Sequence, residues 1–206
     1  MLIEGQTFSF DPHADAINLG LVYGIFANQN QRLGLHNRIY REIILNYMSA
    51  NAEHTSPISG REHSDAYRMP DNRFDTKKSL LKFQELLKKE YSKKDRDFLE
   101  RQGRLVFLAF LKPILNGHGH AFKEPQISEE KRLDILITYY QHQHVIELKL
   151  WRGQQAHEAG LDQLADYLER LGLDEGALLI FDHSGVKDWK SEDIVHRGKQ
   201  IFAVWV

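Results

Sequence analysis

Residues 132–151 read RLDILITYYQHQHVIELKLW, and this stretch decides the fold. Two runs rich in β-branched and aromatic residues flank the polar segment Gln141-His142-Gln143, a pattern typical of two strands joined by a turn. If the turn centres on Tyr140-Gln141, antiparallel pairing places Asp134 directly opposite Glu147, because paired position numbers then have a constant sum. We therefore predict a hairpin that carries both carboxylates on one face of a sheet.

Side chains alternate along a strand, so Lys149 shares the face of Glu147, while Leu148 and Leu150 point the other way. Two neighbouring carboxylates in a sheet are unfavourable unless a positive group joins them. Mg²⁺ or Mn²⁺ fits that role, with Asp134 and Glu147 as ligands, and Lys149 could orient or activate an attacking water. A cross-strand ion pair on an exposed sheet face is the alternative explanation of the same residues.

Four further residues near this hairpin are candidates for the same site. Glu124, on the strand expected before it, could add a third acidic group that supports the metal, or could be a surface glutamate. Gln163 and Tyr167 are spaced i and i+4 on an expected helix, so both could reach over the edge of the sheet to substrate. Arg152, just after the second strand, could contact a scissile phosphate or simply pair with a nearby acid.

Working outward, periodicity and turn residues predict an α/β fold with helix, three-stranded mixed sheet, helix and strand in that order. We expect an N-terminal hairpin-plus-helices extension with its loop over residues 1–72 and the core over residues 73–206. Expected elements are a hairpin at 21–36, a helix from an Asn37 cap to 48, a helix from about 75 to 91, a helix capped by Asp95 to about 115 and closed by Pro113 and Asn116-Gly117, a strand at 121–127, the hairpin above, a helix at 157–171 stopped by Gly172, and strands at 177–182 and 200–206.

Composition excludes several classes of protein. The 206 residues contain no cysteine, which rules out a disulfide scaffold, a thiol nucleophile and a cysteine-ligated zinc site. The start lacks the layout of a signal peptide, and the longest apolar runs are core-sized, so we expect a cytoplasmic protein without a membrane partner. The net charge of −2 neither supports nor forbids nucleic-acid binding.

We interpret the pairs His118-Gly-His120 and His142-Gln-His144 as exposed loop histidines, because no further ligands have zinc spacing.

Long segments of the chain resemble one family. ELKLWRG at 147–153 and HEAGLDQLADYLERLGLDEGALLIFD at 157–182 resemble the C-terminal nuclease domain of bacterial AAA-ATPase-like proteins, which belongs to the PD-(D/E)XK (restriction-endonuclease-like) superfamily. GIFANQNQRL, HNRIY, FLERQGRLVFLAFLKPILNGHG and KEPQISEEKRLDILITY match upstream in the same order. The resemblance covers most of the chain from about Leu21, and the loop at 49–72 is least covered.

The resemblance implies a Mg²⁺- or Mn²⁺-dependent endo- or exonuclease acting on DNA. In that superfamily an acidic residue on the second strand and E-x-K on the third bind metal and drive phosphodiester hydrolysis, which implies Asp134, Glu147 and Lys149 here. It also points to Glu124 as a further acidic residue. Leu133 stands where the motif name has proline, a position that is often not proline in such families.

On the following helix, Gln163 and Tyr167 resemble the Q-x-x-x-Y element of RecB-like nucleases, which helps to position DNA. Relatives usually carry an ATPase, but this sequence has no G-x-x-x-x-G-K-[ST] loop, so we expect an ATPase domain or partner chain, or a stand-alone version. A homodimer is also possible. Two other classes stay open: a catalytically silent module that binds nucleic acid or protein, and an assembly arm in which residues 21–48 dock a partner.

Overall fold

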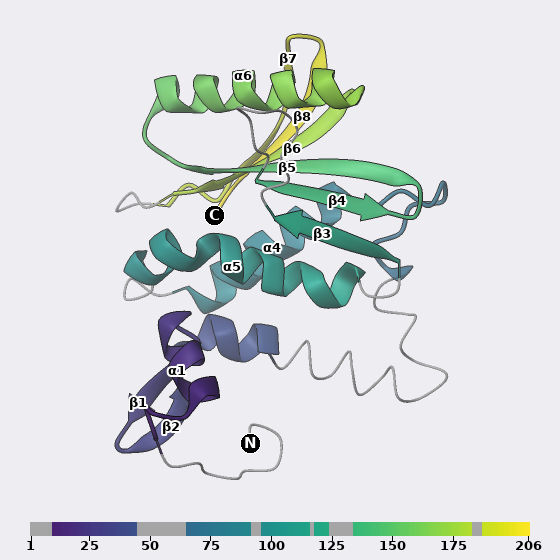
Figure 1. Cartoon of the computed structure of the whole chain (residues 1–206). Coiled ribbons are helices and arrows are strands. Elements are labelled where there is room, and N and C mark those ends of the chain that lie inside the picture. The colour runs from purple at the N-terminus through teal and green to yellow at the C-terminus, as the bar shows by residue number, and fades with distance from the viewer. Residues whose placement is uncertain (1–9, 45–64, 92–95, 116–117, 124–133, 183–186) are drawn as a thin grey trace.

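The computed structural model describes residues 10–44, 65–91, 96–115, 118–123, 134–182 and 187–206. A six-stranded sheet has the order β3-β4-β5-β6-β8-β7, and a separate two-stranded hairpin pairs β1 with β2. In Figure 1, α6 lies on one face of the large sheet, α4 and α5 lie on the other, and α1 with the small hairpin lies beyond α5. The bounds are α1 Asp15–Val22, β1 Phe26–Gln29, β2 Arg32–Leu35, α4 Thr76–Glu90, α5 Arg96–Leu115, β3 Gly119–Lys123, β4 Ile135–Tyr139, β5 His142–Leu150, α6 Gln154–Leu171, β6 Glu175–Phe181, β7 Ser191–His196 and β8 Lys199–Trp205.

The pairing of the strands confirms the predicted α/β class with a mixed sheet, but the sheet has six strands where three were expected. β3, β4 and β5 are antiparallel neighbours, whereas β5 pairs with β6 and β6 pairs with β8 in parallel. A parallel pair needs a crossover connection, and α6 supplies it between β5 and β6. β7 then returns antiparallel to β8 at the edge of the sheet.

Helices on both sides explain why β6 and β8 carry apolar residues on both faces. On the α4 and α5 side, Phe83 and Phe107 pack with ring centroids 4.9 Å apart in a cluster that also holds Ile146 and Leu148. On the α6 side, the leucine stripe of that helix packs against the outer residues of β6 and β8. Strands covered on both faces carry continuous hydrophobic runs, as β6 and β8 do.

The small hairpin is confirmed, although its strands are shorter than the 21–36 expected. Residues 21–22 end α1, and the turn falls at Asn30 and Gln31, whose φ angles are 53° and 63°. Turns with positive φ at both central residues match the twist of paired strands. Asn37 caps the next helix as predicted, since its Oδ1 accepts the amide of Tyr40 at 3.0 Å. That helix is described over 38–44.

Helices α4 and α5 correspond to the two predicted between 75 and 115. Asp75 caps α4, because its side chain accepts the amide of Lys78. The end of α5 at Leu115 is also as predicted, but Pro113 lies inside the helix and does not close it. A proline in the last turn forfeits a single intrahelical hydrogen bond, so the helix continues past it. The expected Asp95 cap lies outside the described residues.

Two other boundaries differ from the prediction, and one strand was not predicted. β3 begins at Gly119, two residues before the expected start, and residues 124–127 of the expected strand lie outside the described residues. α6 begins at Gln154, earlier than the expected 157, and ends as predicted at Gly172, whose φ is 67°. β7 was missed, because its burial is slight and its sequence SEDIVH is mostly polar. No helix in the described part of the chain is long and apolar enough to cross a membrane.

Candidate active site

The register of the central hairpin is the one expected from the sequence. Tyr140 turns the chain with φ of 50°, and Ile135 pairs with Ile146 at the far end of the ladder. The next step of this register places Asp134 opposite Glu147, as predicted. The two carboxylates therefore meet where β4 begins.

Beyond this point β5 continues without β4. Among the described residues the β4–β5 ladder ends at Ile146, whereas the other edge of β5 stays paired with β6 as far as Leu150. The Asp134 side chain fills the first open position: its Oδ2 accepts the backbone amide of Leu148 at 3.0 Å. A side-chain oxygen thus takes the place of a strand partner, which fixes the carboxylate beside Glu147.

A third charged residue enters from the other layer of the fold. Arg104 of α5 places Nη2 at 2.6 Å from Oδ1 of Asp134. Arg104 was not among the predicted site residues, since a single arginine on an amphipathic helix carries no local sign of its tertiary partner. The open edge of β5 gives this side chain its route from the α5 face to the carboxylate.

Glu147 is the most unusual polar group of the site. Only 1% of its surface is exposed, and its Oε1 lies 2.8 Å from Nζ of Lys149. Its Oε2 is buried and has no hydrogen-bond partner within the described structure. Burial, aided by the nearby charge of Asp134, raises the pKa of Glu147 to about 7, although Lys149 acts in the opposite direction. An acid with this environment is poised to change its charge near neutral pH.

Lys149 is held from two sides. Its Nζ donates to Oε1 of Gln163 at 2.9 Å, and Nε2 of Gln163 donates to the hydroxyl of Tyr167 at 2.8 Å. The lysine stem passes over Gly160, where an added Cβ would lie 3.3 Å from the lysine Cγ. α6 therefore positions the amine through one glutamine and leaves room for its stem at one glycine.

The structure assigns Gln163 and Tyr167 a contact that the sequence did not predict. Both were expected to reach substrate, but Tyr167 is only 2% exposed and contacts Gln163. In this arrangement the pair orients Lys149. Arg152 is exposed just after β5, near the end of the strand that carries Lys149. A role for Arg152 in substrate binding stays a prediction.

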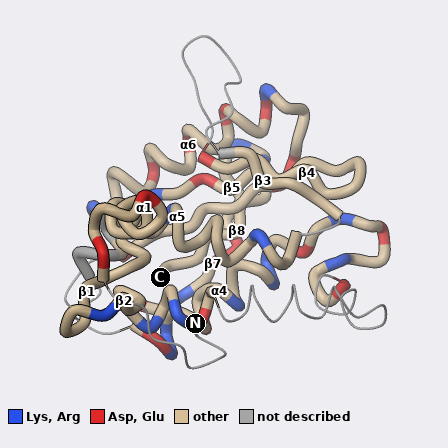
Figure 2. Tube along the Cα trace, turned by 60° about the horizontal axis from the view of Figure 1, so that its bottom comes forward, with Lys and Arg blue, Asp and Glu red and all other residues tan. Residues whose placement is uncertain are grey.

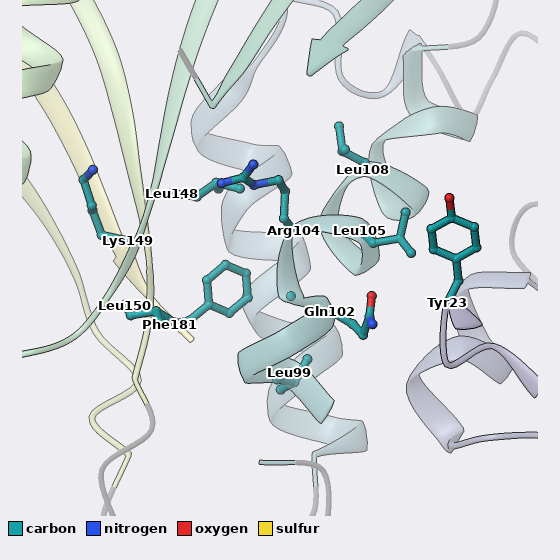
Figure 3. Close-up of a pocket in the computed structure, with 11 residues that line it drawn as sticks. Tyr23, Leu99, Gln102, Arg104, Leu105, Leu108, Leu148, Lys149, Leu150 and Phe181 are labelled. Carbon is teal, nitrogen blue, oxygen red and sulfur yellow. The ribbon is translucent and has the colours of Figure 1, made fainter. Parts of the chain in front are cut away.

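A groove adjoins the charged cluster on the α5 side. Its volume is about 370 Å³, and mostly apolar walls meet a few polar groups. Figure 3 shows Arg104 reaching from α5 toward Leu148, while the Lys149 side chain lies on the opposite side of β5. The lining residues are Tyr23, Leu99, Gln102, Gly103, Arg104, Leu105, Leu108, Leu148, Lys149, Leu150 and Phe181.

The donor set fits a hard divalent cation. Magnesium takes one or two carboxylates and completes its shell with waters and phosphate oxygens. Asp134 and Glu147 offer two carboxylates, and the unpartnered Oε2 of Glu147 is a buried acceptor that a cation would satisfy. Within the described ranges no group of three acidic or histidine side chains converges on one point. Glu124, the predicted third acid, lies outside the described residues.

The hairpin histidines do not belong to this site. His144 was expected in an exposed loop, but Phe74 donates its amide to Nε2 of His144 at 3.2 Å, and the Thr76 hydroxyl lies 3.3 Å from Nδ1. Burial lowers the pKa of His144 to about 4. His144 is therefore a neutral packing residue at the opposite end of β5, which corrects the loop interpretation.

Comparisons with family models, curated proteins and solved structures gave no match to this chain. The resemblance to the PD-(D/E)XK superfamily therefore stays a prediction from the sequence. At the site, Asp134 accepts the backbone amide of Leu148, and the two residues that flank Leu148 on β5, Glu147 and Lys149, form an ion pair.

Proposed function

We propose that this protein is a metal-dependent nuclease of the PD-(D/E)XK (restriction-endonuclease-like) type that hydrolyses phosphodiester bonds in DNA. One observation carries the proposal. Glu147 is a buried carboxylate with one oxygen on Lys149 and the other without a hydrogen-bond partner among the described residues, and the register places it opposite Asp134. A bound cation would satisfy this buried oxygen.

The chain supplies a distinct role for each residue of the site. Asp134 and Glu147 would hold Mg²⁺ or Mn²⁺, with Glu124 proposed as a further acidic group. When bound, the cation supplies positive charge to the carboxylates and to the phosphate oxygens. Lys149, fixed by Glu147 and Gln163, would orient the attacking water and stabilise the negative charge that develops on the phosphate.

The order of elements around the site supports the core that the resemblance implies. α5, then β3, β4 and β5, then α6 and β6 follow the predicted sequence of helix, three strands, helix and strand. The proposed E-x-K strand lies in the interior of the sheet, paired in parallel with β6. An interior strand holds its side chains rigidly, which suits residues that must align with a substrate.

Cations near the groove suit an anionic substrate. Arg104 lines the groove, Lys149 carries its amine on the other side of β5, and Arg152 follows at the end of the same strand. Elsewhere, Lys and Arg alternate with Asp and Glu along the described trace (Figure 2). We therefore expect DNA binding to depend on a few local phosphate contacts, with a correspondingly small salt dependence.

A cleavage assay tests the proposal. Purified protein is incubated with single- and double-stranded DNA and RNA, in Mg²⁺, Mn²⁺ or EDTA. We expect cleavage of DNA only with metal, and a loss of about 100-fold or more in Lys149→Ala, the range for removing a positioned catalytic group. Lys112→Ala changes an exposed lysine of α5 and serves as the matched control. Equal cleavage by the wild-type and Lys149→Ala proteins would contradict the assignment.

One observation favours a second candidate, the catalytically silent binding module. Arg104 and Lys149 already pair with Asp134 and Glu147, so the cluster is partly neutralised by the chain itself. A silent module would bind DNA equally well in EDTA and leave it intact with every metal. The same assay therefore separates the two candidates. The predicted ATPase partner and homodimer stay predictions.

A further inference from the structure

We infer that Arg104 is a positioning residue that exchanges partners: it neutralises Asp134 before metal enters and binds the substrate phosphate afterwards. This inference rests on the proposed nuclease function and deepens it. It concerns a residue that neither the motif nor the resemblance assigned.

The two oxygens of Asp134 have different tasks. Oδ2 is fixed by the backbone amide of Leu148 at 3.0 Å. Oδ1 is the oxygen that faces Arg104 at 2.6 Å. A divalent cation that binds Oδ1 brings a second positive group to the same atom, and like charges at such a distance repel. Arg104 and the metal therefore compete for Asp134.

The displaced guanidinium of Arg104 would remain at the groove. The Arg104 side chain is 38% exposed and lines the groove beside Leu148, so it can move without unpacking α5. A guanidinium presents donors in a planar fork that matches a phosphate as well as a carboxylate. Figure 3 shows this side chain extended from α5 toward β5, at the groove.

Lys149 differs from Arg104 in this respect. Its amine is held by Glu147 at 2.8 Å and by Gln163 at 2.9 Å, and its stem lies against Gly160. Lys149 therefore keeps its place when a metal binds. Lys149 is thus the fixed cation that would act in the reaction, and Arg104 is the exchangeable cation that would bind the substrate.

Opposite shifts in two affinities test the inference. Mn²⁺ is titrated calorimetrically into the wild-type, Arg104→Gln and Lys112→Gln proteins, and a short fluorescent duplex is titrated in Ca²⁺. We expect Arg104→Gln to bind Mn²⁺ about threefold to tenfold more tightly and DNA about tenfold more weakly, as loss of one charged hydrogen bond gives. Lys112→Gln removes one charge from the same helix and should match the wild type in Mn²⁺ affinity.

Unchanged or weaker Mn²⁺ binding by Arg104→Gln would overturn the inference, since a purely structural arginine would only help to hold Asp134 in place. If Arg104→Gln does not fold, Arg104→Met, which removes the charge and keeps an unbranched stem, decides: tighter Mn²⁺ binding than wild type supports the exchange, and equal or weaker binding overturns it. Absence of Mn²⁺ uptake by the wild type would instead contradict the proposed function. Uptake by the wild type without the shift contradicts the exchange alone.

Discussion

Glu147 and His144 lie three positions apart on β5, but they differ in their hydrogen-bond partners. Both ring nitrogens of His144 meet polar atoms, the amide of Phe74 and the hydroxyl of Thr76. Glu147 is more deeply buried, yet its Oε2 has no partner among the described residues. Burial lowers the pKa of His144 to about 4 and raises that of Glu147 to about 7, so each is shifted toward its neutral form.

We interpret His144 as a structural polar group and propose a functional role for Glu147. A buried polar atom without a partner costs about 1–3 kcal/mol. The described residues include others, among them Nζ of Lys187 and Nε1 of Trp205, so Glu147 is set apart also by its position opposite Asp134. His144 has been integrated into the packing, whereas Glu147 keeps one acceptor open beside Asp134. Replacing Glu147, His144 and Tyr167 in turn tests whether Glu147 is functional and His144 structural, and the expected effect decreases in that order.

Replacing Glu147 should give the largest change in stability, and the change should depend on pH. A raised folded-state pKa means that the folded protein keeps a proton that the unfolded chain loses above pH 4.5. Stability from this group is thus fully present below about pH 4.5 and is lost as the pH rises through about 7. Glu147→Gln does not titrate, so without metal it should exceed wild type by up to about 3 kcal/mol at pH 8.

Urea unfolding at pH 5, 6, 7 and 8, in EDTA, measures this difference. Glu158→Gln changes an exposed acid of α6 and serves as the control. A stability difference that stays constant across this range would show that Glu147 is charged in the folded protein throughout.

Replacing His144 should lower the stability of the protein, whereas replacing Glu147 should raise it. His144→Leu leaves the Phe74 amide without its acceptor, which should lower the free energy of unfolding at pH 7 by about 2 kcal/mol. The wild type loses stability as the pH falls from 6.5 through about 4, because the folded-state pKa is lowered, so the deficit of the variant should shrink there. DNA cleavage per folded molecule should equal that of the wild type. A large loss of cleavage would place His144 in the site.

Removing the hydroxyl of Tyr167 should change the stability and the cleavage rate least. Tyr167→Phe removes the acceptor of the Gln163 amide, which should cost about 1 kcal/mol of stability. Because Gln163 orients Lys149, the cleavage rate should fall about threefold to tenfold, less than in Lys149→Ala. Steady-state rates on one DNA substrate measure this. A loss as large as that of Lys149→Ala would mean that Tyr167 contacts the substrate.

Local patterns predicted the hairpin that carries the site. Alternation along β5 and the turn at Tyr140 fixed which side chains share a face, and the structure has that register. Alternation also separates Lys149, which meets α6, from Leu148, which joins the α4 and α5 cluster. These inferences need only neighbouring residues, which is why the sequence sufficed for them.

Contacts between layers could not be predicted in this way. Arg104 reaches Asp134 only because α5 docks against the sheet where β4 begins, and no spacing in the sequence encodes that docking. The two bonds of His144 come from residues about 70 positions away. β7 escaped notice because an exposed edge strand needs little apolar surface, although Arg197-Gly198, both with positive φ, marks its turn.

The most direct test of the central claim is a calorimetric titration of Mn²⁺ into the wild-type protein, Asp134→Asn and Glu147→Gln at pH 7.5. The account predicts one saturable Mn²⁺ site in the wild type and its loss in both variants, each of which stays folded by circular dichroism. Equal Mn²⁺ binding by all three proteins, or none by the wild type, would contradict the claim that these two carboxylates form a metal site.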